Sequence, residues 1–126
     1  MSILKLSEDR DMGGILREIN LKSGMPTVDD AIKKTTYNVK NAAALGISAI
    51  KLIHGYGSSG KGGAIRTESR KYLDRLQARK EIRYYIKGED FSIFDESTRN
   101  AFALCAELRN DCDLERHNNG ITIIIV

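Results

Sequence analysis

The chain has 126 residues, of which 41% are hydrophobic and 29% are charged. This composition is typical of one folded domain that buries a core without disulfides, and it excludes a disordered chain. A formal net charge of +3 is too small to name a partner by itself. With only two cysteines and no Cys/His cluster, neither a disulfide scaffold nor a structural zinc site is expected.

The sequence shows no signal for export or for membrane insertion. Residues 1–11 mix charged with apolar side chains and lack the apolar stretch of a signal peptide. The longest apolar run, 121–126, is too short to span a membrane. We therefore expect a cytoplasmic protein with no membrane partner, divided into an N-terminal extension, 1–14, and one domain, 15–126.

Strand and helix patterns alternate along the predicted domain. Thr27 and Gly46 have the residue types that begin and end a helix, and the run 47–53 has the apolar, β-branched content of a buried strand. The predicted strands are 15–21, 47–53, 82–87 and 121–126, and the predicted helices are 28–45, 64–79 and 95–109. The order β-α-β-α-β-α-β predicts an α/β domain with right-handed parallel connections between strands.

Residues 54–63 contain five glycines and join a predicted strand to a predicted helix. Glycine lets backbone N–H groups approach an anion closely, and a helix N-terminus favours negative charge. We expect a mobile loop here that is neither helix nor strand. Its spacing also resembles a Walker A motif, but Gly62 stands where Ser or Thr must hold magnesium, so a nucleotide-binding protein is the less favoured alternative.

Positive charge gathers in the same region. Between residues 51 and 87 there are ten basic and three acidic residues, a net charge of +7, so the remainder of the chain carries −4. This asymmetry indicates a polyanion-binding surface, although a solvated helix face would give the same pattern. Tyr56 is a candidate for stacking on a base. The candidate nucleic-acid-binding residues are Gly55, Tyr56, Gly57, Gly60, Lys61, Arg66 and Arg70.

Three motifs give the chain a resemblance to a known family. They are Lys51-Leu-Ile-His54-Gly-Tyr-Gly-Ser-Ser-Gly followed by Ile65-Arg66, the closing Gly120-Ile-Thr122, and the opening Ile19-Asn-Leu-Lys22. Over about residues 15–126 the sequence resembles the small MutS-related (Smr) domain, in particular its short stand-alone bacterial members. The segment Asp90-Phe-Ser-Ile-Phe94 is similar to those members as well.

The resemblance implies a two-layer α/β sandwich with a mixed four-stranded sheet, like the C-terminal domain of bacterial translation initiation factor three. It also implies binding of DNA or RNA and, in several relatives, metal-assisted endonuclease activity. Such an enzyme would act in DNA repair or RNA quality control with Mg²⁺ or Mn²⁺ and no organic cofactor.

His54 is the strongest catalytic candidate, because it ends a buried strand and opens the glycine loop. An imidazole there can exchange protons or hold a metal, with Asn20 and Lys22 as companions. The alternative is that His54 only ties the loop down by hydrogen bonds. Asn20, Lys22 and Ser23 replace the family's Asp, His and Gly, so we expect any cleavage to be weak. The alternative function is a non-catalytic module that binds nucleic acid or the ribosome.

Overall fold

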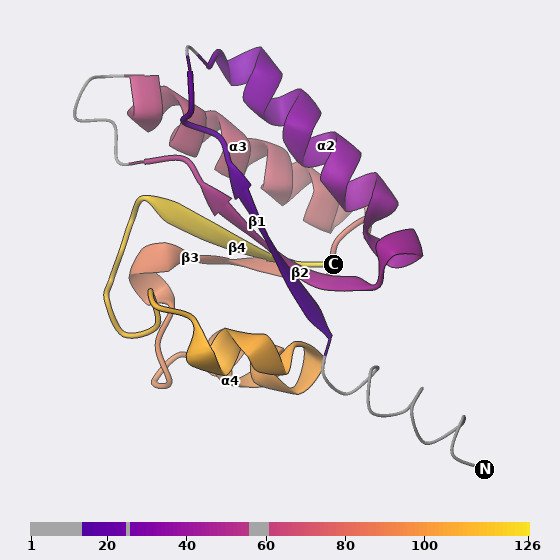
Figure 1. Ribbon diagram of the computed structural model, residues 1–126, viewed down its shortest axis with the longest axis vertical. Helices are drawn as coiled ribbons and strands as arrows, with labels where there is room; N and C mark the ends of the chain where they lie inside the picture. Colours follow the sequence, from indigo (N-terminus) through magenta and orange to yellow (C-terminus); the bar gives the residue numbers. More distant parts are fainter. Residues whose placement is uncertain (1–13, 25, 56–60) are drawn as a thin grey trace.

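The computed structural model describes residues 14–24, 26–55 and 61–126, and these form a mixed four-stranded sheet with helices on both faces (Figure 1). The strands are β1 (Ile15–Asn20), β2 (Ile47–Ile53), β3 (Tyr84–Lys87) and β4 (Ile121–Ile125). Their order across the sheet is β1-β2-β4-β3. β1 and β2 are parallel, whereas β4 runs antiparallel to both β2 and β3.

The helices divide between the two faces of the sheet. α2 (Val28–Leu45) and α3 (Lys61–Ala78) lie side by side over one face, and with the sheet they form the two layers that the Smr resemblance implies. The segment after β3 covers the other face as a third layer (Figure 1). Its elements are the 3₁₀ turns η1 (Gly88–Asp90) and η2 (Ala106–Asn110) and the helix α4 (Glu96–Leu104).

Local residue chemistry sets both ends of α2. The Thr27 side chain accepts a hydrogen bond of 3.0 Å from the backbone N–H of Asp30, as the sequence predicts. Gly46 ends the helix with a φ of 72°, a left-handed conformation that suits glycine, and its N–H donates to the carbonyls of Ala42 and Ala43. The helix therefore stops just before β2 begins.

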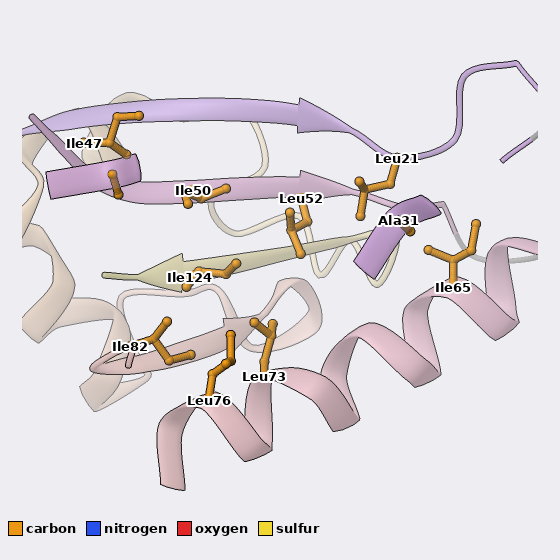
Figure 2. Packing of buried hydrophobic residues seen from close by; sticks show 11 residues of the cluster. Leu21, Ala31, Ile47, Ile50, Leu52, Ile65, Leu73, Leu76, Ile82 and Ile124 are labelled. Atoms are coloured by element: carbon orange, nitrogen blue, oxygen red, sulfur yellow. The ribbon is translucent and has the colours of Figure 1, made fainter. Parts of the chain in front are cut away.

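The larger core lies between the sheet and the pair α2 and α3. Ile50, Leu52 and Ile124 point from the central strands toward Leu73 and Leu76 of α3, and all five are buried (Figure 2). Burying one such side chain contributes about 1.5–3 kcal/mol to folding. The opposite face has its own apolar cluster around Phe91 and Leu108. Because both faces are covered, β2 and β4 read as nearly continuous apolar runs.

The structure corrects several sequence expectations. β4 lies antiparallel to both of its neighbours, as the mixed sheet of the Smr resemblance requires, so the connection from β3 to β4 is not one of the parallel connections that the β-α-β-α-β-α-β order predicts. α3 begins at Lys61 rather than residue 64, which places Gly62 and Gly63 in the helix instead of the loop. The third helix ends at Leu104, because Cys105 is extended and η2 follows it. The remaining part of the predicted loop, 56–60, lies outside the described residues and includes Tyr56, Gly57 and Gly60.

Among the described residues, the helices are all too short or too polar to cross a membrane.

Candidate nucleic-acid interface

The ends of β1 and β2 bring the candidate residues to one edge of the sheet. Asn20 is in register with Ile53, and the N–H of Leu21 donates to the Ile53 carbonyl at 2.8 Å. The segments that follow the two strands therefore leave the sheet together. The Lys22 side chain lies against Gly55, since a Cβ placed on that glycine would be 3.6 Å from Lys22 Cδ.

Asn20 is engaged within its own turn. Its Oδ1 accepts a hydrogen bond of 2.8 Å from the backbone N–H of Lys22, which is the local contact that makes asparagine a turn former. Its carbonyl accepts a hydrogen bond of 3.3 Å from Lys34 Nζ of α2. Asn20 thus shapes the turn that presents Lys22, while Lys22 itself is exposed.

His54 is fully buried, and both of its ring nitrogens have partners. Nδ1 lies 2.9 Å from the Gly55 carbonyl, and Nε2 lies 2.8 Å from the hydroxyl of Thr122 on β4. A carbonyl oxygen only accepts, so Nδ1 must carry the proton. In the neutral ring Nε2 is then the acceptor, and the Thr122 hydroxyl donates to it.

Arg70 of α3 completes this series of hydrogen bonds, and we call the linked residues His54, Thr122, Arg70 and Glu89 the His54 chain. Its Nε donates to the Thr122 hydroxyl at 3.0 Å, and its two terminal nitrogens donate to the Glu89 carboxylate at 3.0 and 2.9 Å. Its side chain is only 13% exposed. From the sequence, Arg70 is a candidate nucleic-acid contact, a role that requires an exposed side chain. The structure instead turns it inward, because Glu89 and Thr122 offer acceptors that match its fixed donors.

The surroundings of His54 keep it neutral. Burial lowers its pKa from 6.5 to about 4, and the positive charges of Arg70 and Arg66 add to this effect. The hydrogen bond to the Gly55 carbonyl opposes the shift but does not cancel it. At pH 7 the His54 ring is therefore neutral and shielded from solvent, and its role is to hold the structure together through its hydrogen bonds.

A second chain of contacts fixes the start of the glycine loop. The N–H groups of His54 and Gly55 both donate to the Gly120 carbonyl, at 3.0 and 2.9 Å. Gly120 is held in turn by Asn118, whose Oδ1 accepts its N–H at 2.8 Å, and Asn118 donates to Asp113 at 2.9 Å. The loop that precedes β4 therefore positions the loop that follows β2.

This second chain ends at Lys51, a buried charge in the middle of β2. Its Nζ lies 2.6 Å from Asp113, 2.8 Å from Asp111 and 3.8 Å from Glu18. Burial lowers the pKa of Lys51, but hydrogen bonds and charge from Asp111 and Asp113 outweigh burial and raise it overall. Lys51 is thus a permanent cation that is neutralised inside the fold.

The segment 51–87 therefore presents fewer unpaired positive charges at the surface than the sequence predicts. Lys51 and Arg70 are paired and contribute little to the surface field. Lys22, Lys34 and Arg66 form no ion pair with a carboxylate of residues 14–24, 26–55 or 61–126. We call these three residues the edge cations. Lys22 and Lys34 flank the end of β1, and Arg66 is near enough to lower the His54 pKa.

Comparison with known proteins agrees with this geometry. The structure is similar to the crystal structure of the Smr domain of Thermus thermophilus MutS2, with a TM-score of 0.53 and 22% sequence identity over 86% of this chain and 95% of that one. The chain has an Smr-like fold. This confirms the mixed-sheet fold that the sequence resemblance implies. No family model matches the sequence, and no curated protein matches it either.

In residues 14–24, 26–55 and 61–126, the edge of this Smr-like domain offers few of the oxygen donors that a hard divalent cation needs. Mg²⁺ and Mn²⁺ prefer carboxylate and carbonyl oxygens. The described side chains there are the Asn20 amide, which is used in a turn, the His54 ring, whose two nitrogens are both hydrogen-bonded, the three edge cations, and one carboxylate, Asp30, which lines a shallow pocket together with Lys34. The nearest carboxylate in the His54 chain, Glu89, is held by Arg70. A separate group, Asp111, Cys112 and Asp113, has metal-ligating atoms close together, but its carboxylates already bind the Lys51 ammonium.

Sequence reasoning missed two members of the His54 chain. Thr122 had a visible signal, because it belongs to the Gly120-Ile-Thr122 motif of the Smr resemblance. Glu89 had none, since its pairing with Arg70 joins residues 19 positions apart through the tertiary structure. Lys51 had a partial signal, because a lysine within an apolar strand needs a buried counter-charge.

The His54 environment predicts how the stability of this Smr-like domain depends on pH. The unfolded chain takes up a proton near pH 6.5 and the folded one only near pH 4, so the His54 contribution is complete above 6.5 and is lost as the pH falls toward 4. The pKa difference corresponds to about 3 kcal/mol. Urea unfolding at a series of pH values between 4 and 7 measures this change in the free energy of unfolding. His54→Gln should remove most of the slope of the free energy of unfolding against pH. His117→Gln, at an exposed histidine, is the control and should keep that slope. An equal slope in both variants would contradict the account.

Proposed function

We propose that the chain is a nucleic-acid-binding domain that receives a phosphate backbone at the carboxyl edge of β1 and β2. The observation that carries the proposal is the set of edge cations, of which Lys22 lies against Gly55 and Lys34 reaches the end of β1, and none of which is paired with a described carboxylate. Charges left free in this way are available to phosphates, whereas paired ones are not. The proposal narrows the sequence expectation, since it leaves Arg70 out of the binding surface.

The start of α3 supports the same site. α3 has 18 residues, begins at Lys61 and carries no acidic residue in its first turn. The first N–H groups of a helix lack partners within it, and the helix dipole favours an anion at that end. Arg66 lies in the second turn of α3 and adds a guanidinium group suited to phosphate oxygens. The N-terminus of α3, the backbone at Gly55 and the edge cations therefore all favour a negatively charged ligand.

Within this proposal His54 is a positioning residue. A general base or acid needs a nitrogen within reach of the reacting group, and both nitrogens of His54 are bonded inside the protein. This favours the non-catalytic binding module among the alternatives that the sequence left open. The endonuclease activity that the sequence resemblance implies stays a prediction, and no step of it is assigned to described residues.

The binding proposal predicts a steep salt dependence that the edge cations create. Lys22→Ala and Arg66→Ala should each weaken binding to different sequences alike, and each should reduce the slope of log affinity against log salt by about one. Fluorescence anisotropy with labelled DNA and RNA measures this. Arg79→Ala is the matched control, because Arg79 follows the far end of α3 and pairs with Glu81. Equal effects of Arg66→Ala and Arg79→Ala would contradict the proposed site.

A cleavage assay separates the positioning role of His54 from catalysis. Labelled single-stranded, duplex and branched DNA and RNA are incubated with wild type and His54→Gln, with and without Mg²⁺ or Mn²⁺. We expect the substitution to weaken binding, because the loop loses its tie to Thr122, and any cleavage to fall in proportion. A fall in cleavage of about a hundredfold or more with binding intact would assign proton transfer to His54 and overturn the positioning role.

A further inference from the structure

We infer that the ligand is a single-stranded nucleic acid and that the outer face of α2 forms a second contact surface for it. On this surface Tyr37 stacks on a base. The inference rests on the proposed function and names its substrate class. The surface consists of Lys33, Lys34, Tyr37 and Lys40, which we call the α2 ridge.

Tyr37 differs from the other tyrosines that the structure describes. Tyr72, Tyr84 and Tyr85 are half-buried, and their hydroxyls have hydrogen-bond partners in Thr36, the Ser97 carbonyl and Asp74. Tyr37 is 67% exposed, and its hydroxyl has no partner among the described residues. Packing within this domain therefore does not account for an aromatic ring at that position.

The charges around Tyr37 match a nucleic-acid strand. Residues three and four positions away on a helix are surface neighbours, so Lys33, Lys34 and Lys40 lie on the same exposed face of α2 as Tyr37. Lys34 and Lys40 have no carboxylate partner among the described residues, and Lys33 has only an exposed pair with Asp29 at 3.3 Å. Such an exposed pair is worth little, so it yields readily to phosphate.

The α2 ridge continues the proposed interface. Lys34 Nζ reaches the Asn20 carbonyl at the end of β1, and Tyr37 follows one helical turn later. In Figure 1, α2 begins beside the carboxyl end of β1 and runs away from it along the outside of the molecule. A strand bound at the edge cations therefore meets Tyr37 as it extends over α2.

An exposed aromatic ring selects for unpaired bases. Its face stacks on a base that is free to turn outward, while the bases of a duplex already stack on one another. The lysines would contact the phosphates of either form. The ring is therefore what distinguishes single strands from duplexes on this surface.

The test compares Tyr37→Ala, Tyr37→Phe and Phe94→Ala in anisotropy titrations with a single strand and the duplex of the same sequence. Phe94, 85% exposed before α4, is the control for loss of an exposed aromatic ring elsewhere. Tyr37→Ala should weaken single-strand binding about tenfold, within the range expected for one stacked base, and leave duplex binding nearly unchanged. Tyr37→Phe should bind like wild type, because it keeps the ring, and so should Phe94→Ala.

Three results would overturn the inference and spare the proposed function, and the first two concern Tyr37→Ala. They are single-strand affinity unchanged in Tyr37→Ala while Arg66→Ala still weakens binding, or equal losses for single strand and duplex. Loss of single-strand binding in Tyr37→Phe as well as Tyr37→Ala would also contradict stacking. If neither form of nucleic acid binds the wild type, the proposed function itself fails.

Discussion

The hydroxyl of Thr122 is the contact on which the functional edge depends. It donates to His54, which directly follows β2, and accepts from Arg70 of α3. One oxygen of β4 therefore links the end of β2 to a helix, and Glu89 adds η1. A buried polar group left without its partner costs about 1–3 kcal/mol. Each member therefore fixes the others, and the edge beside Gly55 is held in place before any ligand arrives.

The buried ammonium of Lys51 provides the second constraint. Removing one partner from a buried ion pair costs about 3–5 kcal/mol, since the other charge remains unsolvated. Lys51 therefore holds Asp111 and Asp113 firmly against the sheet. Through Asn118 and Gly120 this anchor reaches the backbone of His54 and Gly55. Both networks converge on the first residues of the glycine loop, which is the segment proposed to approach phosphates.

Local patterns in the sequence predict much of the fold. Thr27 and Gly46 determine the ends of α2 through short-range contacts, and the apolar run of β2 has the predicted bounds, Ile47–Ile53. The antiparallel place of β4 between β2 and β3 depends on pairing between distant segments, which local periodicity does not encode. The same limit explains Arg70, whose spacing on α3 predicts an outward side chain until Glu89 and Thr122 are placed beside it.

The candidate site divides in a similar way. The sequence places His54 at the end of a buried strand, and the structure agrees, but the state of its ring depends on Thr122, 68 residues away. Asn20, Lys22 and Gly55 meet because β1 and β2 are adjacent and parallel, which the β-α-β pattern predicts. Tyr37 had no place in the sequence interpretation, because exposure of a single helical residue is known only once its neighbours are packed.

The measurement that tests this account most directly is ¹⁵N NMR of the His54 ring, in the free protein and with a bound oligonucleotide at pH 7. The account predicts a neutral ring with its proton on Nδ1 in both states, because the Gly55 carbonyl and the Thr122 hydroxyl hold it there. A protonated ring, or a change of tautomer when the oligonucleotide binds, would show that His54 exchanges protons with the ligand site and would contradict its role as a fixed strut.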